Sequence, residues 1–199
     1  MDEHVSRLSK LFLQFPGIGE RQARRFAYFI LNQPESYVHM LSATLKDARG
    51  AAHTCTRCLR IFEGQSGLCN ICRDGLRDQN VIVVVEKSQD IDSFKKTDYH
   101  GLYFVLGGLI PIVQKNILDG TNAKRLVERV KTDTGLDEII LAFPITPNGD
   151  HTDQAIRELL APVARPELHI SSLGRGLSAG AELEYADAES LSASLKKRE

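Results

Sequence analysis

Four cysteines give the sequence its clearest chemical signal. They are the only cysteines among 199 residues, and they form two CxxC pairs. Such pairs can supply four thiolates to one metal ion, and tetrahedral Zn²⁺ favours that ligand set. Because four thiolates leave no coordination position open, we expect a structural zinc ion and no metal-based catalysis there. The predicted ligands are Cys55, Cys58, Cys69 and Cys72.

Disulfides and redox-active dithiols are the alternative uses of these cysteines. Both are rare in the reducing cytoplasm. The chain begins with the polar segment MDEHVSRLSK, which lacks the hydrophobic core of a signal peptide. It also has no apolar run of about 18 residues that could span a membrane. We therefore expect a cytoplasmic protein with zinc bound to its cysteines.

A second signal lies near the N-terminus, where the sequence PGIG separates two amphipathic segments. Its glycines allow a tight turn that exposes backbone N–H groups at the start of a helix, where a phosphate oxygen can bind. Three arginines follow at once. This pattern predicts a helix-hairpin-helix motif that holds the DNA backbone without reading its sequence. A plain connection with a solvated basic face is the alternative. The predicted DNA contacts are Gly17, Gly19, Arg21, Arg24 and Arg25.

An acidic pair follows the β-branched run 81–85. Glu86 stands at the end of this run, and Asp90 comes four residues later. Enzymes of the topoisomerase–primase (Toprim) class combine such a glutamate with a DxD motif after a later strand to hold Mg²⁺. Here the later strand is followed only by Asp150 and Asp153, so the metal cage is incomplete. Two roles stay open for the pair: charges at a helix N-terminus and a docking surface for a basic partner.

The elements that must position these residues change in character along the chain. Residues 5–31 predict two amphipathic helices around the turn, and Ser36–Ala52 predicts a third. The Cys55–Cys72 insert has too few large apolar residues to fold by itself. Beyond Asn80, apolar strands alternate with helical patterns, which is typical of a parallel α/β sheet. The predicted strands are 81–85, 101–106, 139–143 and 168–170, and the predicted helices lie around 123–130, 155–160 and 188–197.

The expected fold class is therefore a multi-part α+β protein with a parallel α/β portion. We place its boundaries at 1–54 for the helix-hairpin-helix region, 55–72 for the zinc finger, 80–175 for the Toprim-like domain and 176–199 for the C-terminal segment. Hydrophobic residues make up 42% of the chain and charged residues 26%. These values exclude a disordered, collagenous or coiled-coil protein. The aromatic residues fall on apolar faces and are expected in the core.

Net charge is uneven along the chain. Residues 1–80 carry 11 basic and 8 acidic side chains, whereas residues 81–199 carry 14 basic and 18 acidic ones. This asymmetry favours a polyanion as a partner for the front of the chain and not for the back. Ordinary scatter in composition is the alternative interpretation. No P-loop or dinucleotide-binding glycine pattern is present in the sequence.

Together, these signals resemble one family, the bacterial recombination mediator RecR. The resemblance is carried by residues 11–31, 55–74, 81–91, 101–108 and the glycine-spaced LEYAD ending at 176–191. The loops at 109–113 and 144–152 depart from the family pattern. In the second of these loops, Asn148 stands where the family has an acidic residue.

The resemblance implies a non-catalytic protein that assembles as a ring-shaped homotetramer able to encircle DNA. Members act with RecO, and with RecF where it is present, to load RecA onto single-stranded DNA. By this resemblance Arg21 and Arg25 contact DNA, and Glu86 and Asp90 bind the partner protein. The four cysteines then hold the zinc that supports the architecture of the subunit.

Two rival functions remain at this point. A Toprim nuclease or primase would use Glu86, Asp150 and Asp153 with Mg²⁺. A zinc-ribbon adaptor would bind proteins and have no direct role on DNA.

Overall fold

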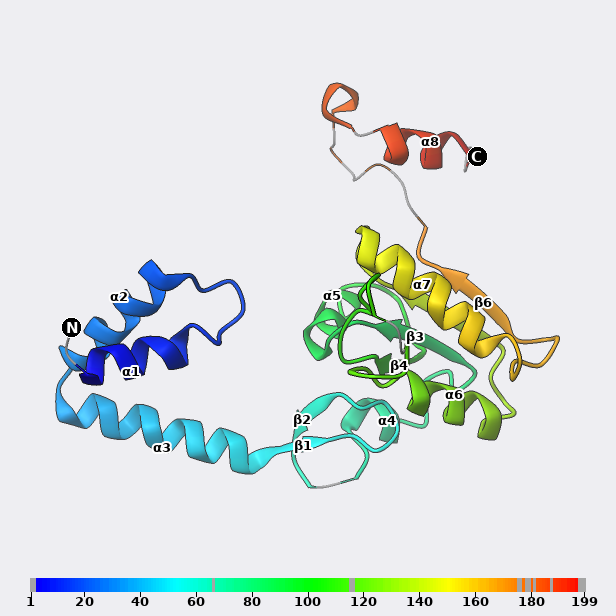
Figure 1. Cartoon of the computed structure of the whole chain (residues 1–199). Helices are drawn as coiled ribbons and strands as arrows, with labels where there is room; N and C mark the ends of the chain where they lie inside the picture. Colours follow the sequence, from blue (N-terminus) through cyan, green and yellow to red (C-terminus); the bar gives the residue numbers. More distant parts are fainter. Residues whose placement is uncertain are drawn as a thin grey trace. The chain divides into compact units, whose positions relative to one another are not determined.

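A computed structural model describes residues 3–65, 67–114, 117–174, 177, 180, 182–186 and 188–196. The chain divides into two compact units, Met1–Ala52 and His53–Glu199. Figure 1 shows a helical first unit, and a second unit built around a parallel sheet. None of the described helices combines the length and hydropathy that crossing a membrane requires.

The first unit is a helical hairpin followed by a longer helix. Helices α1 (Glu3–Phe12) and α2 (Glu20–Leu31) lie side by side (Figure 1). Their contact buries Val5, Ala23 and Ala27. Helix α3 (Glu35–Ala51) buries none of its residues within the chain. The predicted hairpin is confirmed, and the predicted third helix begins and ends one residue earlier than expected.

For several aromatic residues of this unit, the prediction of a core position is wrong. The Phe12 ring meets the rings of Phe15 and Phe26 edge-on, at centroid distances of 5.7 and 5.8 Å. However, Phe15 and Phe29 remain 54% and 51% exposed. A unit of this size has too little interior to cover every apolar side chain of its helices. An apolar helix face therefore does not by itself imply burial within the chain.

The cysteine insert is built from two short strands and one helical turn. Strands β1 (Ala52–Thr54) and β2 (Ile61–Glu63) pair, and α4 (Asn70–Arg73) follows. The insert docks on the sheet portion: the Val105 N–H donates to the Cys58 carbonyl at 2.8 Å. Its buried residues also join the hydrophobic core of the sheet. This shared core agrees with the prediction that the insert cannot fold by itself.

Four parallel strands form the sheet of the second unit. They are β3 (Val81–Val85), β4 (Leu102–Val105), β5 (Glu138–Ala142) and β6 (His169–Ser172), in the order β4-β3-β5-β6. Every residue of β4, and all of β3 except Val81, is buried. Such runs suit strands covered on both faces. The four predicted strands are confirmed: 81–85 keeps both its ends, and the ends of the other three move by one or two residues.

The connecting elements are η1 (Ser88–Asp90) with α5 (Ile91–Phe94), then α6 (Ala123–Thr132) and α7 (Pro147–Leu160). Strand β4 lies on one side of β3, and β5 and β6 lie on the other. Right-handed crossovers therefore put α6 and α7 on the same face, and these helices do contact each other (Figure 1).

Helix α7 begins earlier than its apolar pattern predicts. Pro147 occupies the first turn, and the Thr146 hydroxyl caps the helix by accepting from the Gly149 N–H at 3.1 Å. A capping threonine followed by proline is a recognised start signal. As a result Asp150 and Asp153 lie on the first two turns of a helix.

The C-terminal segment contains η2 (Leu183–Tyr185) and α8 (Ala188–Lys196). The predicted last helix is thus confirmed as far as Lys196. Lys197 lies outside the described residues. Part of the glycine-spaced motif, at 176, 178, 179, 181 and 187, also lies outside them.

Candidate functional site

The four predicted metal ligands come together as one buried cluster. Their Sγ atoms all lie within 4.8 Å of one another, and all four residues are buried. The Cys58 and Cys69 sulfurs are 3.6 Å apart. Tetrahedral zinc with Zn–S bonds of about 2.3 Å places its sulfurs about 3.8 Å apart. The cluster is therefore arranged to hold a metal ion, and its spacing fits zinc.

Backbone hydrogen bonds hold the cysteine side chains in place. The Cys55 N–H donates to the Arg60 carbonyl at 2.9 Å, which closes the first knuckle. Leu59 turns the chain there with φ of 62°. The Cys69 N–H donates to the Cys55 Sγ at 3.4 Å, so one knuckle orients a ligand of the other. Such N–H···S contacts fix ligand geometry around a metal.

The cysteine thiols cannot all ionise without a cation. Hydrogen bonds with Cys69 and Cys72 raise the pKa of Cys58, and burial raises it further. The hydrogen bond with Cys58 lowers the pKa of Cys69. For Cys72, a hydrogen bond with Cys58 lowers the pKa, but one with Cys69 and burial outweigh it, and the pKa rises to about 12. A divalent metal supplies the charge that lets the remaining thiols ionise.

The N-terminal hairpin presents an uncapped helix start. Gly17 adopts a left-handed conformation with φ of 76°. Gly19 is the N-cap of α2 and offers no side chain to the amides of the first turn. A Cβ added at either glycine would meet nothing within 4 Å in the described chain. The backbone here is therefore open to an incoming phosphate.

The predicted DNA-contacting arginines share one face of α2. Arg21, Arg24 and Arg25 are exposed, and Tyr28 continues the same face one turn on. With Glu20, these side chains line a shallow cavity of about 330 Å³. Within the described residues, none of the three arginines forms a salt bridge. Their guanidinium groups can therefore pair with an external anion.

Two glycine substitutions are expected to have opposite effects in this unit. Neither a Cβ at Gly17 nor one at Gly50 meets an atom within 4 Å, but only Gly17 has a positive φ. Gly17→Ala should destabilise the unit by about 1–2 kcal/mol because an L-residue is strained there. Gly50→Ala should stabilise α3 by about 0.5–1 kcal/mol. Hydrogen exchange of α2 and α3 amides measures both, and equal effects would contradict the assigned hairpin conformation.

Glu86 lies where the topology of the sheet changes direction. It follows β3, and the chain connects from β3 to β4 on one side and from β4 back to β5 on the other. Ligands and partners of open α/β sheets commonly bind at such points. The Glu86 side chain is 16% exposed and pairs with Lys87 Nζ at 2.8 Å. The Asp90 carboxylate accepts a hydrogen bond from the Lys87 N–H at 2.7 Å, and this bond caps the start of η1.

No second metal cluster forms among the acidic residues that the structure describes. In that part of the chain, the cysteines are the one group of three or more ligating side chains that could hold an ion. Asp153 forms an ion pair with Arg157, with an Oδ1–Nε distance of 2.7 Å.

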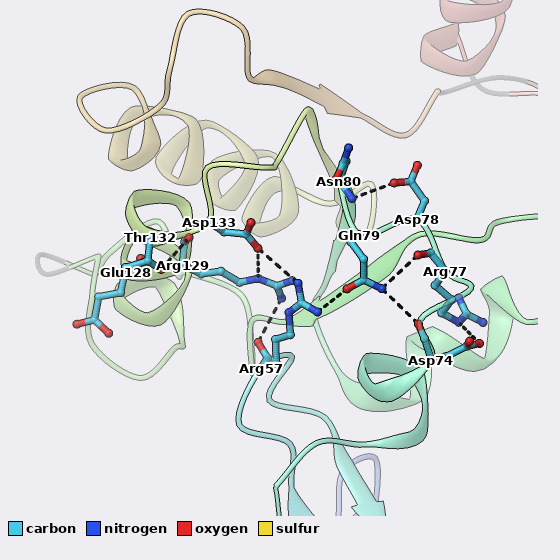
Figure 2. Close-up of polar contacts among 10 residues, drawn as sticks. All are labelled: Arg57, Asp74, Arg77, Asp78, Gln79, Asn80, Glu128, Arg129, Thr132 and Asp133. Carbon is cyan, nitrogen blue, oxygen red and sulfur yellow. Dashed lines mark hydrogen bonds and ion pairs between the residues drawn. The ribbon is translucent and has the colours of Figure 1, made fainter.

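A polar network that sequence reasoning missed joins the insert to the sheet portion. Figure 2 shows Arg57, from the first cysteine knuckle, between Gln79 and Asp133. Arg129 of α6 reaches the same point, and its Nη1 donates to the Arg57 carbonyl at 3.2 Å. Gln79 in turn donates to the carbonyls of Asp74 and Arg77. The network ties the metal-binding loop to α6 and to the segment before β3.

Arg129 is an unusual residue in this position. It is only 9% exposed, and it lies between the buried Leu126 and Val130 on the inner side of α6. Burial lowers the pKa of Arg129, and the nearby charge of Arg57 lowers it further. The sequence signal that could have revealed it was an arginine beside the apolar stripe of a helix, because charged side chains are rarely buried unless they are paired.

A helix-hairpin-helix unit, a four-cysteine metal knuckle and a parallel Toprim-type sheet together define a class of protein that acts on DNA. Family models agree: "RecR, helix-hairpin-helix" matches residues 5–49, "Toprim domain" residues 80–173 and "RecR, C-terminal" residues 176–199.

Curated relatives match over nearly the full chain. A "Recombination protein RecR" from Lacticaseibacillus casei is 33% identical over 98% of this chain and 96% of its own length. The corresponding proteins of Levilactobacillus brevis and Limosilactobacillus reuteri are 34% and 35% identical over 93% of this chain, and over 91% and 90% of their own lengths. The chain belongs to the RecR family of recombination proteins, which supports a role in recombinational repair.

Proposed function

We propose that the protein is a cytoplasmic, non-catalytic, DNA-binding mediator of recombinational repair, which acts with RecO, and with RecF where it is present, to promote RecA loading. The observation that carries this proposal is the exposed arginine face beside the uncapped start of α2. Backbone N–H groups and guanidinium groups converge there, and both bind phosphate oxygens. Contacts of this kind position a protein on DNA without reading its sequence.

We further propose assembly into a tetrameric ring. Exposed apolar side chains of the first unit, including Leu11, Phe29 and Leu45, support an interface with another chain. Several copies of the arginine face in one assembly would raise the overall affinity for DNA by avidity. A ring would therefore bind DNA more tightly than one arginine face alone.

The metal is proposed to be one structural Zn²⁺ per chain, held by the four cysteines. Bound zinc would fix both knuckles and, through them, the docking of the insert on β4 and α6. Its role is architectural because all four positions are taken by protein sulfur.

Glu86 and Asp90 are proposed to bind a basic surface of the partner protein. Glu86→Lys should weaken partner binding by about tenfold or more, because it turns an attraction into a repulsion. Glu167→Lys, an exposed change of equal charge elsewhere on the unit, is the control in a pull-down titration with purified RecO. The protein incubated with DNA and Mg²⁺ should show no strand scission. Scission that Glu86→Gln abolishes would favour the nuclease alternative.

Salt dependence tests the DNA-binding proposal directly. If three arginines per chain neutralise three phosphates, log K should fall against log salt with a slope near −2.7 for each bound chain, at about −0.9 per phosphate. Arg25→Gln should make that slope less steep by about 0.9. Fluorescence anisotropy of labelled duplex DNA measures both slopes. If DNA binding is absent, or does not change with salt concentration, the protein is instead an adaptor that reaches DNA only through its partner.

A further inference from the structure

A cavity of about 530 Å³ lies between the first cysteine knuckle and α6. This is within the usual size range of small-molecule sites, roughly 300–1,000 Å³. Arg57 and Leu59 come from the knuckle, Arg125, Glu128 and Arg129 come from α6, and Asp133 follows that helix. The cavity lies wholly within the second unit and uses none of the residues of the arginine face on α2.

The arginines of this cavity are incompletely paired. Asp133 Oδ2 lies 3.6 Å from Arg57 Nη2 and 3.9 Å from Arg129 Nε. A charge-assisted hydrogen bond is shorter, about 2.7–2.9 Å. Within the described residues, Nε and Nη2 of Arg129 are buried and have no hydrogen-bond partner. Leaving charged donors unpaired is costly, so the site is prepared for a better acceptor than Asp133.

The charge and the lining of the cavity select the kind of ligand. Three arginines face two carboxylates there, which leaves one positive charge in excess. One phosphodiester group carries one negative charge, and its oxygens match the fork of a guanidinium group. Leu59 provides an accessible apolar wall, and Thr56 and Thr132 contribute hydroxyl groups. Phe104 also lines the cavity but is only 1% exposed. An unpaired base can lie against such a wall while the hydroxyl groups bond to its polar atoms.

We propose that this cavity binds one nucleotide unit, with its phosphate on Arg57, Arg125 and Arg129 and its base against the apolar wall of Leu59. The unit comes from a nucleic-acid strand whose base is unstacked, or from a free mononucleotide of the same chemistry. This site is additional to the arginine face of α2 and does not depend on the function proposed for that face.

The test uses the metal-loaded full chain with Arg21→Glu and Arg25→Glu, which removes the α2 contribution. Binding of a labelled single-stranded oligothymidylate is followed by fluorescence anisotropy. Arg125→Glu and Lys124→Glu are then added separately, because both side chains are exposed on α6 and only Arg125 lines the cavity. Thymidine monophosphate represents the free source, and ¹⁵N spectra of the arginine Nε–H groups report where it binds.

We expect the background protein to retain oligothymidylate binding. Arg125→Glu should weaken this binding about tenfold to a hundredfold, as for a lost hydrogen bond to a charged group, and Lys124→Glu should leave it within about twofold. Thymidine monophosphate should shift the Nε–H resonances of Arg57 and Arg129. If the resonances shift but the strand does not bind, the free mononucleotide is the ligand.

Two results would overturn the proposal. Equal weakening by Lys124→Glu and Arg125→Glu would show general attraction to a basic surface. Unshifted Arg57 and Arg129 resonances, with no residual strand binding, would mean that Arg129 only balances the charge of the nearby metal thiolates. Neither result bears on DNA binding by the arginine face of α2, because that binding is measured with protein in which Arg21 and Arg25 are unchanged.

Discussion

Replacing Cys72 with serine is expected to remove the bound zinc and destabilise the protein by at least about 4 kcal/mol, as for other losses of a structural metal. Cys72 is one of four buried ligands whose sulfurs lie within 4.8 Å of one another. The remaining thiols cannot hold the metal in a closed tetrahedron, and the insert has little apolar core of its own. For a chain of this length, the change corresponds to a fall in Tm of roughly 10 °C.

Metal content by mass spectrometry and thermal unfolding measure this effect together. Asn70→Ser is the matched control, because Asn70 is exposed and lies between the two cysteines of the second knuckle. A chelator added to the unchanged protein should reproduce the loss, and hydrogen exchange should show residues 52–73 opening first. A Cys72→Ser protein with full zinc and an unchanged Tm would rule out the four-thiolate site.

Reversing two charges on α2, in Arg21→Glu/Arg25→Glu, is expected to weaken DNA binding by about a hundredfold or more. Each arginine contact with a phosphate is worth about 1.5–3 kcal/mol, and each glutamate adds repulsion. Both side chains are exposed, so the fold should survive. Anisotropy with labelled duplex DNA gives the affinity, and circular dichroism confirms the helices.

Arg7→Glu/Arg49→Glu makes the same change in net charge on the same unit and serves as the control. Both residues are exposed and lie on α1 and α3. If binding depends on the arginine face, this control should lose less than about fivefold, through long-range attraction alone. Equal losses in the two double variants would argue that only net charge matters and that the hairpin has no special role.

The strands and the metal ligands could be predicted from sequence because their signals are local. The run 81–85 is β-branched throughout, so it predicts a buried parallel strand without any knowledge of its neighbours. The CxxC spacing already limits each pair to one knuckle. The glycines of PGIG predict a tight turn, and Gly17 adopts a left-handed conformation in that turn.

The start of α7 was missed for a different reason. Apolar periodicity begins well inside the helix. The helix itself starts earlier, where Thr146 is the N-cap and Pro147 lies in the first turn. The signal was present in the sequence, but it lay in the residue types at the boundary and not in the hydrophobic pattern.

What the sequence alone determined was therefore the four strands of the sheet, the longer helices, the four clustered cysteines and the basic run that follows the hairpin. Only the tertiary structure decided which apolar faces find a partner within the chain, so that Ala27 is buried and Phe29 is exposed. It also brought Arg57 to Arg129 across 72 positions of sequence. Side-chain spacing along a helix or knuckle follows from local geometry, but contacts between distant segments depend on how the chain packs as a whole.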